Sequence, residues 1–470
     1  MNAPVIWILF PAGLSIILFI FQRREWIVSG LATIAALGLA ALAVWLPAEE
    51  QIIIGPLNIS FSDTLLVLGR QFILSEADRP ALVMLYLTAG IWFGAATVAR
   101  AGRIFVPLGL AMVALLTAAI AVEPFLYAAL IIEIAVLVSI PFLSREGEWV
   151  GRGVLRYLTF QTLGVPFILF TGWILAGVES TPSDETLIIT AGIMMALGFS
   201  LLLAIFPFHT WIPMIAQESH PFTAAFVFLV LPGAVFLFGL SFFDRYVWLR
   251  DSQAIHLVLR WVGVLMVLIA GVWSVFQRHP GRLLGFALLL EIGFSLVAIG
   301  LAQGEQTAQY LGLFFTALLP RGLGFGVWAL ALSVMRMHTP KLGFEHIRGL
   351  ARVYPVTAAC LILAVFSLAG LPLLASFPIR ISLLKGLAEV SPQSAVLALI
   401  GMGGLLLGGL RTLAVLVGGE NNIPWKVNES RIQHYYLGLG VLGLFLLGLF
   451  PQWFLPFFQN MSVAFEQLVP

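Results

Sequence analysis

Four ionisable side chains stand in the middle of long apolar runs, where no water is at hand to solvate a charge. They are Glu133 in ALIIEIAVL, Glu291 in FALLLEIGFS, Arg321 in TALLPRGLGFG and Arg380 in SFPIRISLL. A charge at the bilayer centre costs about 2.5–3.5 kcal/mol. Two acids and two bases can neutralise one another. They could form a relay in which the carboxylates carry protons, structural ion pairs between helices, or contacts to a neighbouring subunit.

A second chemical signature is FPFHTWIP at residues 206–213, at the end of the apolar run GIMMALGFSLLLAI. Its prolines remove backbone donors, so a membrane helix must break there and satisfy its freed groups with protein or water. His209 lies at this break. It titrates near neutral pH and suits a proton relay, although it could equally satisfy freed backbone carbonyls.

A matching break occurs in LAGLPLLASFPIRISLLK, residues 368–385. Prolines can merely kink membrane helices. Two breaks at corresponding places instead favour an inverted repeat with an ion site at the interrupted helices.

Composition defines the class of protein that holds these residues. The chain has 470 residues, is 60% hydrophobic and 10% charged, and has a mean hydropathy of +1.03, which indicates a polytopic membrane protein. The net charge of +1 gives no sign of a nucleic-acid partner. One cysteine excludes a disulfide framework, and seven scattered histidines predict neither a metal site nor any cofactor.

Apolar runs of roughly 20 residues predict the membrane spans. We expect an all-α integral membrane protein with about 14 transmembrane helices, arranged as two inverted five-helix repeats with discontinuous helices 7 and 12. The whole chain, 1–470, forms a single polytopic membrane domain. Its parts are N-terminal helices and a hairpin (1–100), a first repeat (102–243), a second repeat (257–416) and a C-terminal helix (436–457).

Two further features concern topology. Residues 50–79 are polar and mixed, which predicts an extramembrane hairpin followed by a short amphipathic helix. Lys and Arg are concentrated in the loops after odd-numbered spans. By the positive-inside rule these loops are cytoplasmic, so we expect a multi-pass protein of the cell inner membrane with both termini outward.

PFHTWIP at 207–213 resembles the PFHTWLP signature of the antiporter-like membrane subunits of respiratory complex I. These are the NADH-quinone oxidoreductase chains of the L, M and N type, with relatives in multisubunit cation/proton antiporters and membrane-bound hydrogenases. The resemblance covers about residues 80–415. It implies a proton-relay role for four residues at the family's charged positions and for the histidine at the helix break. These residues are Glu133, Glu291, Arg321, Arg380 and His209.

The chain also departs from the family pattern. Arg321 and Arg380 stand where relatives carry lysines, and Glu291 where relatives carry histidine. Leu202 replaces the lysine seven residues before the histidine of PFHTW, and the lysine of the eighth span is missing near Ala234. Glu133 has therefore lost the family's charge partner.

The resemblance implies a proton-translocating subunit of a complex I-type respiratory assembly, working with other membrane subunits in the lipid bilayer. It would move H⁺ coupled to redox chemistry in partner subunits. The chain has no dinucleotide fingerprint and no cluster-binding cysteines, so it is at most a translocase subunit without a redox site of its own. The alternatives are a subunit of a cation/proton antiporter that moves Na⁺, of a membrane-bound hydrogenase or of a bicarbonate-uptake complex, or a non-conducting scaffold.

Overall fold

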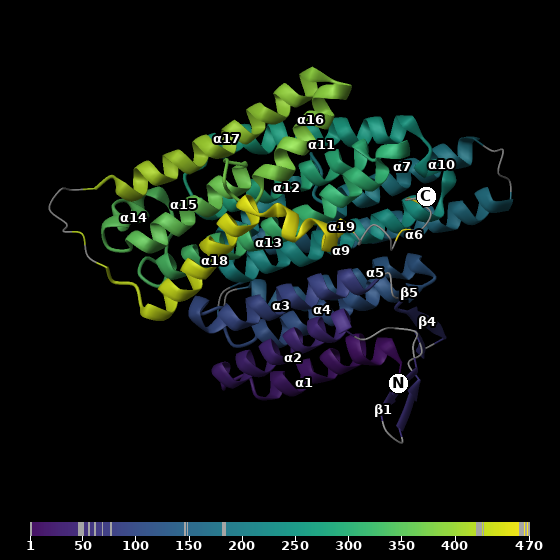
Figure 1. Ribbon diagram of the computed structural model, residues 1–470, viewed down its shortest axis with the longest axis horizontal. Coiled ribbons are helices and arrows are strands. Elements are labelled where there is room, and N and C mark those ends of the chain that lie inside the picture. Colours follow the sequence, from purple (N-terminus) through teal and green to yellow (C-terminus); the bar gives the residue numbers. More distant parts are fainter. Residues whose placement is uncertain are drawn as a thin grey trace. The chain divides into compact units, whose positions relative to one another are not determined.

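The computed structural model describes most of the chain, and nearly all of that part is helical (Figure 1). The described residues are 2–45, 51–54, 57–60, 63–67, 69–75, 78–144, 147, 149–180, 185–419, 425, 427–459, 465 and 468. The chain is an integral membrane protein, as its composition predicts.

Ten helical segments among the described residues are long and apolar enough to cross a bilayer. They are α2 (Glu25–Trp45), α3 (Arg79–Ala99), α5 (Ala128–Leu143) with the turn before it, α6 (Arg152–Ser180), α9 (Pro221–Arg245), α11 (Gln253–Phe276), α12 (Pro280–Leu301), α13 (Thr307–Arg336), α17 (Pro392–Val417) and α18 (Arg431–Leu449).

Shorter apolar helices make up the rest: α1 (Phe10–Ile20), α4 (Phe105–Ala121) and α7 (Glu185–Leu202). A bent pair, α14 (Phe344–Ile347) with its following turn and α15 (Pro355–Ala369), turns through 115°. The all-α membrane fold is confirmed, while the number of fourteen spans stays a prediction.

The segment after α2 forms β-hairpins. Strand β1 (Gln51–Ile54) pairs with β2 (Leu57–Ser60), and β3 (Thr64–Val67) pairs with β4 (Arg70–Ile73), which also pairs with β5 (Val122–Glu123). The predicted hairpin is confirmed, but the amphipathic helix is wrong. Gly69 adopts φ +75° between β3 and β4, which reverses the chain where a helix would have continued.

The chain divides into two compact units. Unit 1 contains Met1–Thr97, Gly102–Trp211 and Val230–Arg245, whereas unit 2 contains Val98–Ala101, Ile212–Leu229 and Tyr246–Pro470.

At the centre of unit 2 lies α12, whose membrane window is 100% buried. A helix that is apolar on every side is stable only when protein surrounds it. Beside it, α11 and α17 approach closely through glycines, since a Cβ on Gly271 would overlap the Gly401 carbonyl oxygen.

Both predicted helix breaks are present. In unit 1, α7 ends at Leu202 and Ala204 has φ +54°, followed by the single turn at residues 208–210. The helix resumes as α8 (Trp211–Glu218), whose first residue lies in unit 1 and the remainder in unit 2. In unit 2, α15 ends at Ala369 and is followed by Gly370 with φ +82°, and α16 (Phe377–Val390) begins after a seven-residue link that starts at Gly370.

Candidate functional site

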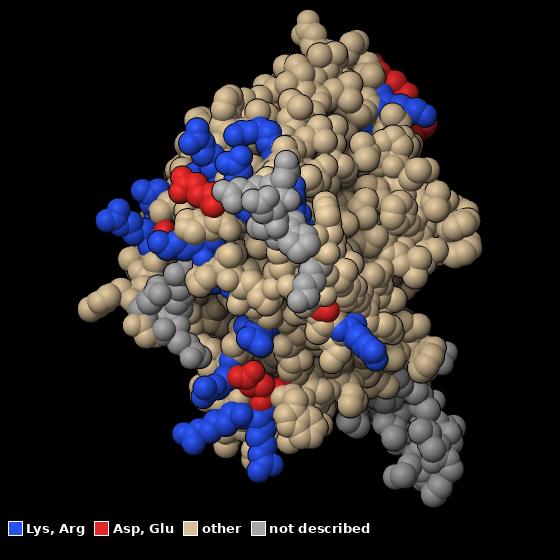
Figure 2. All heavy atoms as spheres, turned by 90° about the vertical axis from the view of Figure 1, so that its left-hand side faces the viewer, with Lys and Arg blue, Asp and Glu red and all other residues tan. Residues whose placement is uncertain are grey.

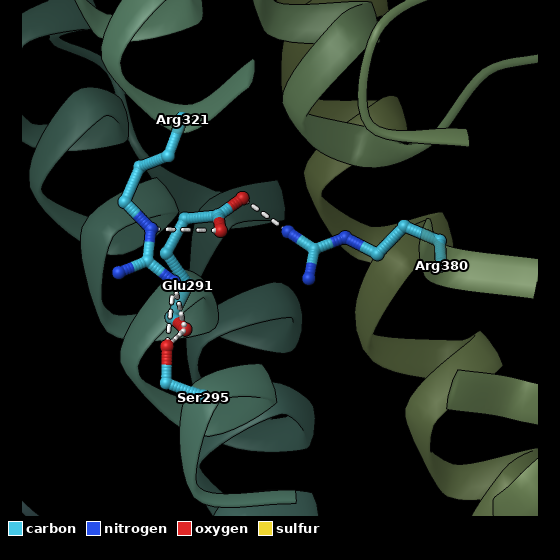
Figure 3. Close-up of polar contacts among 4 residues, drawn as sticks. All are labelled: Glu291, Ser295, Arg321 and Arg380. Carbon is cyan, nitrogen blue, oxygen red and sulfur yellow. Dashed lines mark hydrogen bonds and ion pairs between the residues drawn. The ribbon is translucent and has the colours of Figure 1, made fainter. Parts of the chain in front are cut away.

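Three of the four predicted membrane charges meet in unit 2. Arg321 on α13 donates from Nε to Glu291 Oε2 on α12 at 3.1 Å, and Arg380 on α16 donates from Nη2 to the other carboxylate oxygen (Figure 3). The two guanidinium groups therefore hold one carboxylate from two sides. The sequence offered mutual neutralisation of the four charges as one interpretation, and the structure brings these three into contact.

Burial makes this cluster an internal site. Glu291, Arg321 and Arg380 are each only 2% exposed. At such depth water does not screen the charges, so the ion pairs must compensate for lost hydration. Arg321 gains further partners, because its Nη2 donates to the Glu291 carbonyl at 3.1 Å and to Ser295 Oγ at 2.5 Å.

The local sequence accounts for how each helix presents its side chain. Ser295 follows Glu291 by one helical turn, so both lie on the α12 face that meets Arg321. Arg380 lies in the first turn of α16, just after the break, with Pro378 near the helix start, where a missing N–H costs nothing. The break between α15 and α16 thus places Arg380 next to the Glu291 carboxylate.

Arg380 is less fully satisfied than Arg321. Its guanidinium carbon lies 3.8 Å from the centroid of the Phe294 ring, a cation–π contact. Its Nε is buried and has no hydrogen-bond partner in the described part of the chain. With two cations and one anion, the cluster carries a net charge of +1 (2 − 1).

Glu133 is not part of this cluster. It lies on α5 in unit 1 and is partly exposed, on the same helix face as the exposed residues Leu130 and Leu137. Within the described residues, no hydrogen bond or ion pair reaches its carboxylate. The structure therefore leaves Glu133 without the charge partner that the family resemblance would supply.

Leu202, at the position where the family resemblance implies a lysine, is buried among neighbouring residues. Leu202 is 2% exposed, and a Cβ on Gly164 would lie 2.9 Å from its side chain. Gln161 Nε2 donates to the Leu202 carbonyl at 3.0 Å. Ala234 is likewise buried, so both positions at which the family resemblance implies a lysine hold buried apolar side chains.

His209 occupies the break of unit 1. Its ring stacks on Phe206 with centroids 5.4 Å apart, and its Nδ1 is buried without a hydrogen-bond partner among the described residues. Within the described residues of unit 1, no hydrogen bond or ion pair joins His209 to Glu133. Sequence reasoning missed Ser295, Phe294 and Gln161, although the i+3 and i+4 spacing of Phe294 and Ser295 from Glu291 was available as a signal.

Comparison with known proteins identifies the class. Residues 167–407, just over half of the 470-residue chain, match the family described as NADH:quinone oxidoreductase/Mrp antiporter, transmembrane. The chain belongs to this family, as PFHTWIP indicated, and is an antiporter-like membrane subunit.

Individual relatives agree with this assignment. The chain is 25% identical over 414 residues to NADH-quinone oxidoreductase subunit 13 of Thermus thermophilus, covering 83% of this chain and 84% of that protein. A chain of respiratory complex I from Thermus thermophilus with bound NADH superposes with a TM-score of 0.76 at 23% identity, covering 99% of this chain and 100% of that one. A chain of the Mrp complex from Dietzia sp. DQ12-45-1b gives 0.79 at 16% identity, covering 100% and 99%. These structural matches are to subunits of multisubunit membrane complexes.

Proposed function

We propose that this chain translocates protons as an antiporter-like subunit of a complex I-type assembly in the cell inner membrane, with both termini outward. Partner subunits supply the redox chemistry. The observation that carries the proposal is the buried cluster of Arg321, Glu291 and Arg380, because ionisable groups are retained inside membranes chiefly along ion pathways.

Within this cluster only Glu291 can exchange a proton. A guanidinium group keeps its proton at any physiological pH, so Arg321 and Arg380 act as fixed cations. While both contact the carboxylate, they stabilise its ionised form by charge-assisted hydrogen bonds. Glu291 accepts a proton when one guanidinium withdraws, and releases it when that guanidinium returns.

Arg380 is the guanidinium suited to withdraw. Arg321 is held by three hydrogen bonds, to the Glu291 carboxylate, the Glu291 carbonyl and Ser295. Arg380 has one hydrogen bond to the carboxylate and an unpartnered Nε. It also stands on α16, which is separated from α15 by a link with positive φ at Gly370 and Leu373, a hinge for a small shift of the helix.

A non-conducting scaffold is the second candidate. It is favoured by Leu202 and Ala234, buried apolar residues at the family's lysine positions in unit 1. In that case the buried cluster of unit 2 would only fix the packing of α12, α13 and α16.

Proton flux measured on the assembly in reconstituted vesicles separates the two. We expect Glu291→Gln to lower flux at least tenfold at equal subunit content, and Arg380→Lys to give an intermediate flux because the charge is kept and the reach is shortened. Glu305→Gln, at an exposed position of the same unit, is the matched control. Wild-type flux in both Glu291→Gln and Arg380→Lys would reject the relay and favour the scaffold. Flux that depends on sodium would favour the cation/proton antiporter.

A further inference from the structure

A basic cavity lies at one end of unit 2, away from the buried cluster. Its volume is about 930 Å³, and it lies between the end of α11, the start of α12, α14 and the end of α17. Four arginines line it: Arg278, Arg282, Arg348 and Arg411. Figure 2 shows that Lys and Arg gather on the face at which α14 lies.

The walls of this cavity are fixed by backbone hydrogen bonds. Phe344 N donates to the Arg278 carbonyl at 2.9 Å, which ties α14 to the loop after α11. Gly349 N donates to the Val415 carbonyl at 3.0 Å, which ties the turn after α14 to α17. The cavity is therefore part of the folded unit rather than a gap between independent loops.

Its positive charge is not neutralised from within. Among the described lining residues Glu345 is the one acidic side chain, so four arginines and one glutamate leave a charge of +3 (4 − 1) with the histidines neutral. Within the described residues, none of the four arginines forms an ion pair. Arg282 donates to Gln217 Oε1 at 3.3 Å, while its Nε is buried without a partner. An unpartnered buried guanidinium nitrogen in a basic cavity favours an anionic ligand.

Exposed apolar side chains of α11 and α17 lie next to the same cavity. Trp273 and Phe276 are exposed one turn apart on α11, and Phe276 also lines the cavity. On α17, Leu407 and Leu410 are exposed on the turn before Arg411. Glycine contacts pack α11 closely against α17. A molecule that has an anionic head and hydrocarbon tails fits both halves of this arrangement, whereas a free anion would use only the arginines.

We propose that this cavity binds the headgroup of an anionic phospholipid, whose acyl chains lie along the exposed faces of α11 and α17. The phosphate is held by the arginines, and a headgroup with two phosphates is preferred because the site carries three excess positive charges. The lipid would join α11, α12, α14 and α17 at their ends and stabilise unit 2. The proposal does not depend on proton translocation.

Lipid binding to the assembly, purified in detergent and stripped of lipid, tests the proposal. Cardiolipin should bind and raise the unfolding midpoint, whereas phosphatidylcholine should do neither. Arg348→Gln combined with Arg411→Gln lowers the site charge to +1, which we expect to weaken cardiolipin binding roughly 25-fold. Both positions are exposed, so folding should be preserved.

Lys341→Gln combined with Arg431→Gln removes two exposed charges of the same unit outside the cavity and should leave binding unchanged. Inorganic phosphate at the same phosphate concentration distinguishes a lipid from a free anion, since it should not raise the midpoint. Stabilisation by phosphate alone, equal stabilisation by phosphatidylcholine, or cardiolipin binding retained by the Arg348→Gln/Arg411→Gln variant would each overturn the proposal.

Discussion

The buried cluster predicts an unequal response to removing its anion and removing one of its cations. Glu291→Gln removes the one carboxylate and leaves Arg321 and Arg380 buried and facing each other, with a local charge of +2. Removing the partner of a buried charge typically costs about 3–5 kcal/mol. For a unit of this size that lowers the unfolding midpoint by roughly 6–20 °C.

Arg380→Met has two opposing effects. It loses a charge-assisted hydrogen bond, worth about 1.5–3 kcal/mol, and it removes a buried cation whose desolvation costs several kcal/mol. The remaining pair, Glu291 with Arg321, is neutral. Methionine also keeps a contact with the Phe294 ring through its sulfur. We therefore expect a change within about 1–2 kcal/mol, in either direction.

The comparison uses thermal unfolding of the full chain in detergent, followed by intrinsic tryptophan fluorescence, with Glu305→Gln as the exposed control. The triple substitution Glu291→Gln, Arg321→Met and Arg380→Met removes all charge and should recover much of the stability lost by Glu291→Gln. If Arg380→Met lowered the midpoint as much as Glu291→Gln, the assignment of Glu291 as the shared counter-ion of two arginines would be wrong.

Three further predictions concern other parts of the chain. Gly370→Ala should destabilise unit 2 by about 1–3 kcal/mol in thermal unfolding, because φ is +82° and the new Cβ would lie 2.7 Å from Met402 Cε, whereas Gly438→Ala, with nothing within 4 Å, should not. Burial and nearby Arg282 and Arg336 lower the pKa of His279 to about 4 from 6.5, so between those values the unfolded chain binds a proton that the folded chain does not. Stability should therefore fall as pH drops through this window, and His279→Gln should reduce the fall by about 1–2 kcal/mol in midpoints measured against pH; an unchanged pH profile would contradict this. Leu202→Lys should destabilise unit 1 by about 2–4 kcal/mol without raising proton flux, because the position is buried among apolar groups, and higher flux would contradict this.

The sequence predicts the helices and their interruptions well, because both follow from local chemistry. An apolar run such as Pro280–Leu301 has no alternative to a buried helix in a chain of this composition. Prolines near Phe206 and at Pro372 and Pro378 determine where two helices must stop. Residues 64–73 were mispredicted because their strand pairing depends on a turn at Gly69 and on β5, which lies about fifty residues further along the chain.

Contacts within the candidate site could not be predicted from the sequence, since they depend on how helices pack. Glu291 is 30 residues from Arg321 and 89 residues from Arg380, and no periodicity relates residues on three different helices. Mutual neutralisation of the four charges was one interpretation, but packing brings only three of them together. The basic cavity was missed for the same reason, because its arginines come from the ends of several elements.

The predicted membrane charges of the two units are unbalanced in opposite senses, and the proposed function has to account for this. Unit 1 holds a carboxylate, Glu133, that no cation in the described residues contacts, while unit 2 holds two cations for one carboxylate. A guanidinium that never loses its proton cannot carry one onward, so under the proposed function Glu291 is the proton-exchanging member of the buried cluster. Separating one Arg–carboxylate pair at 4 Å costs about 4 kcal/mol at an effective dielectric constant of 20. At that cost the separated state is populated at roughly 0.1% by thermal motion, so it is accessible as a minor state. Directional transport against a gradient needs a supply of free energy, which under the proposed function comes from the partner subunits.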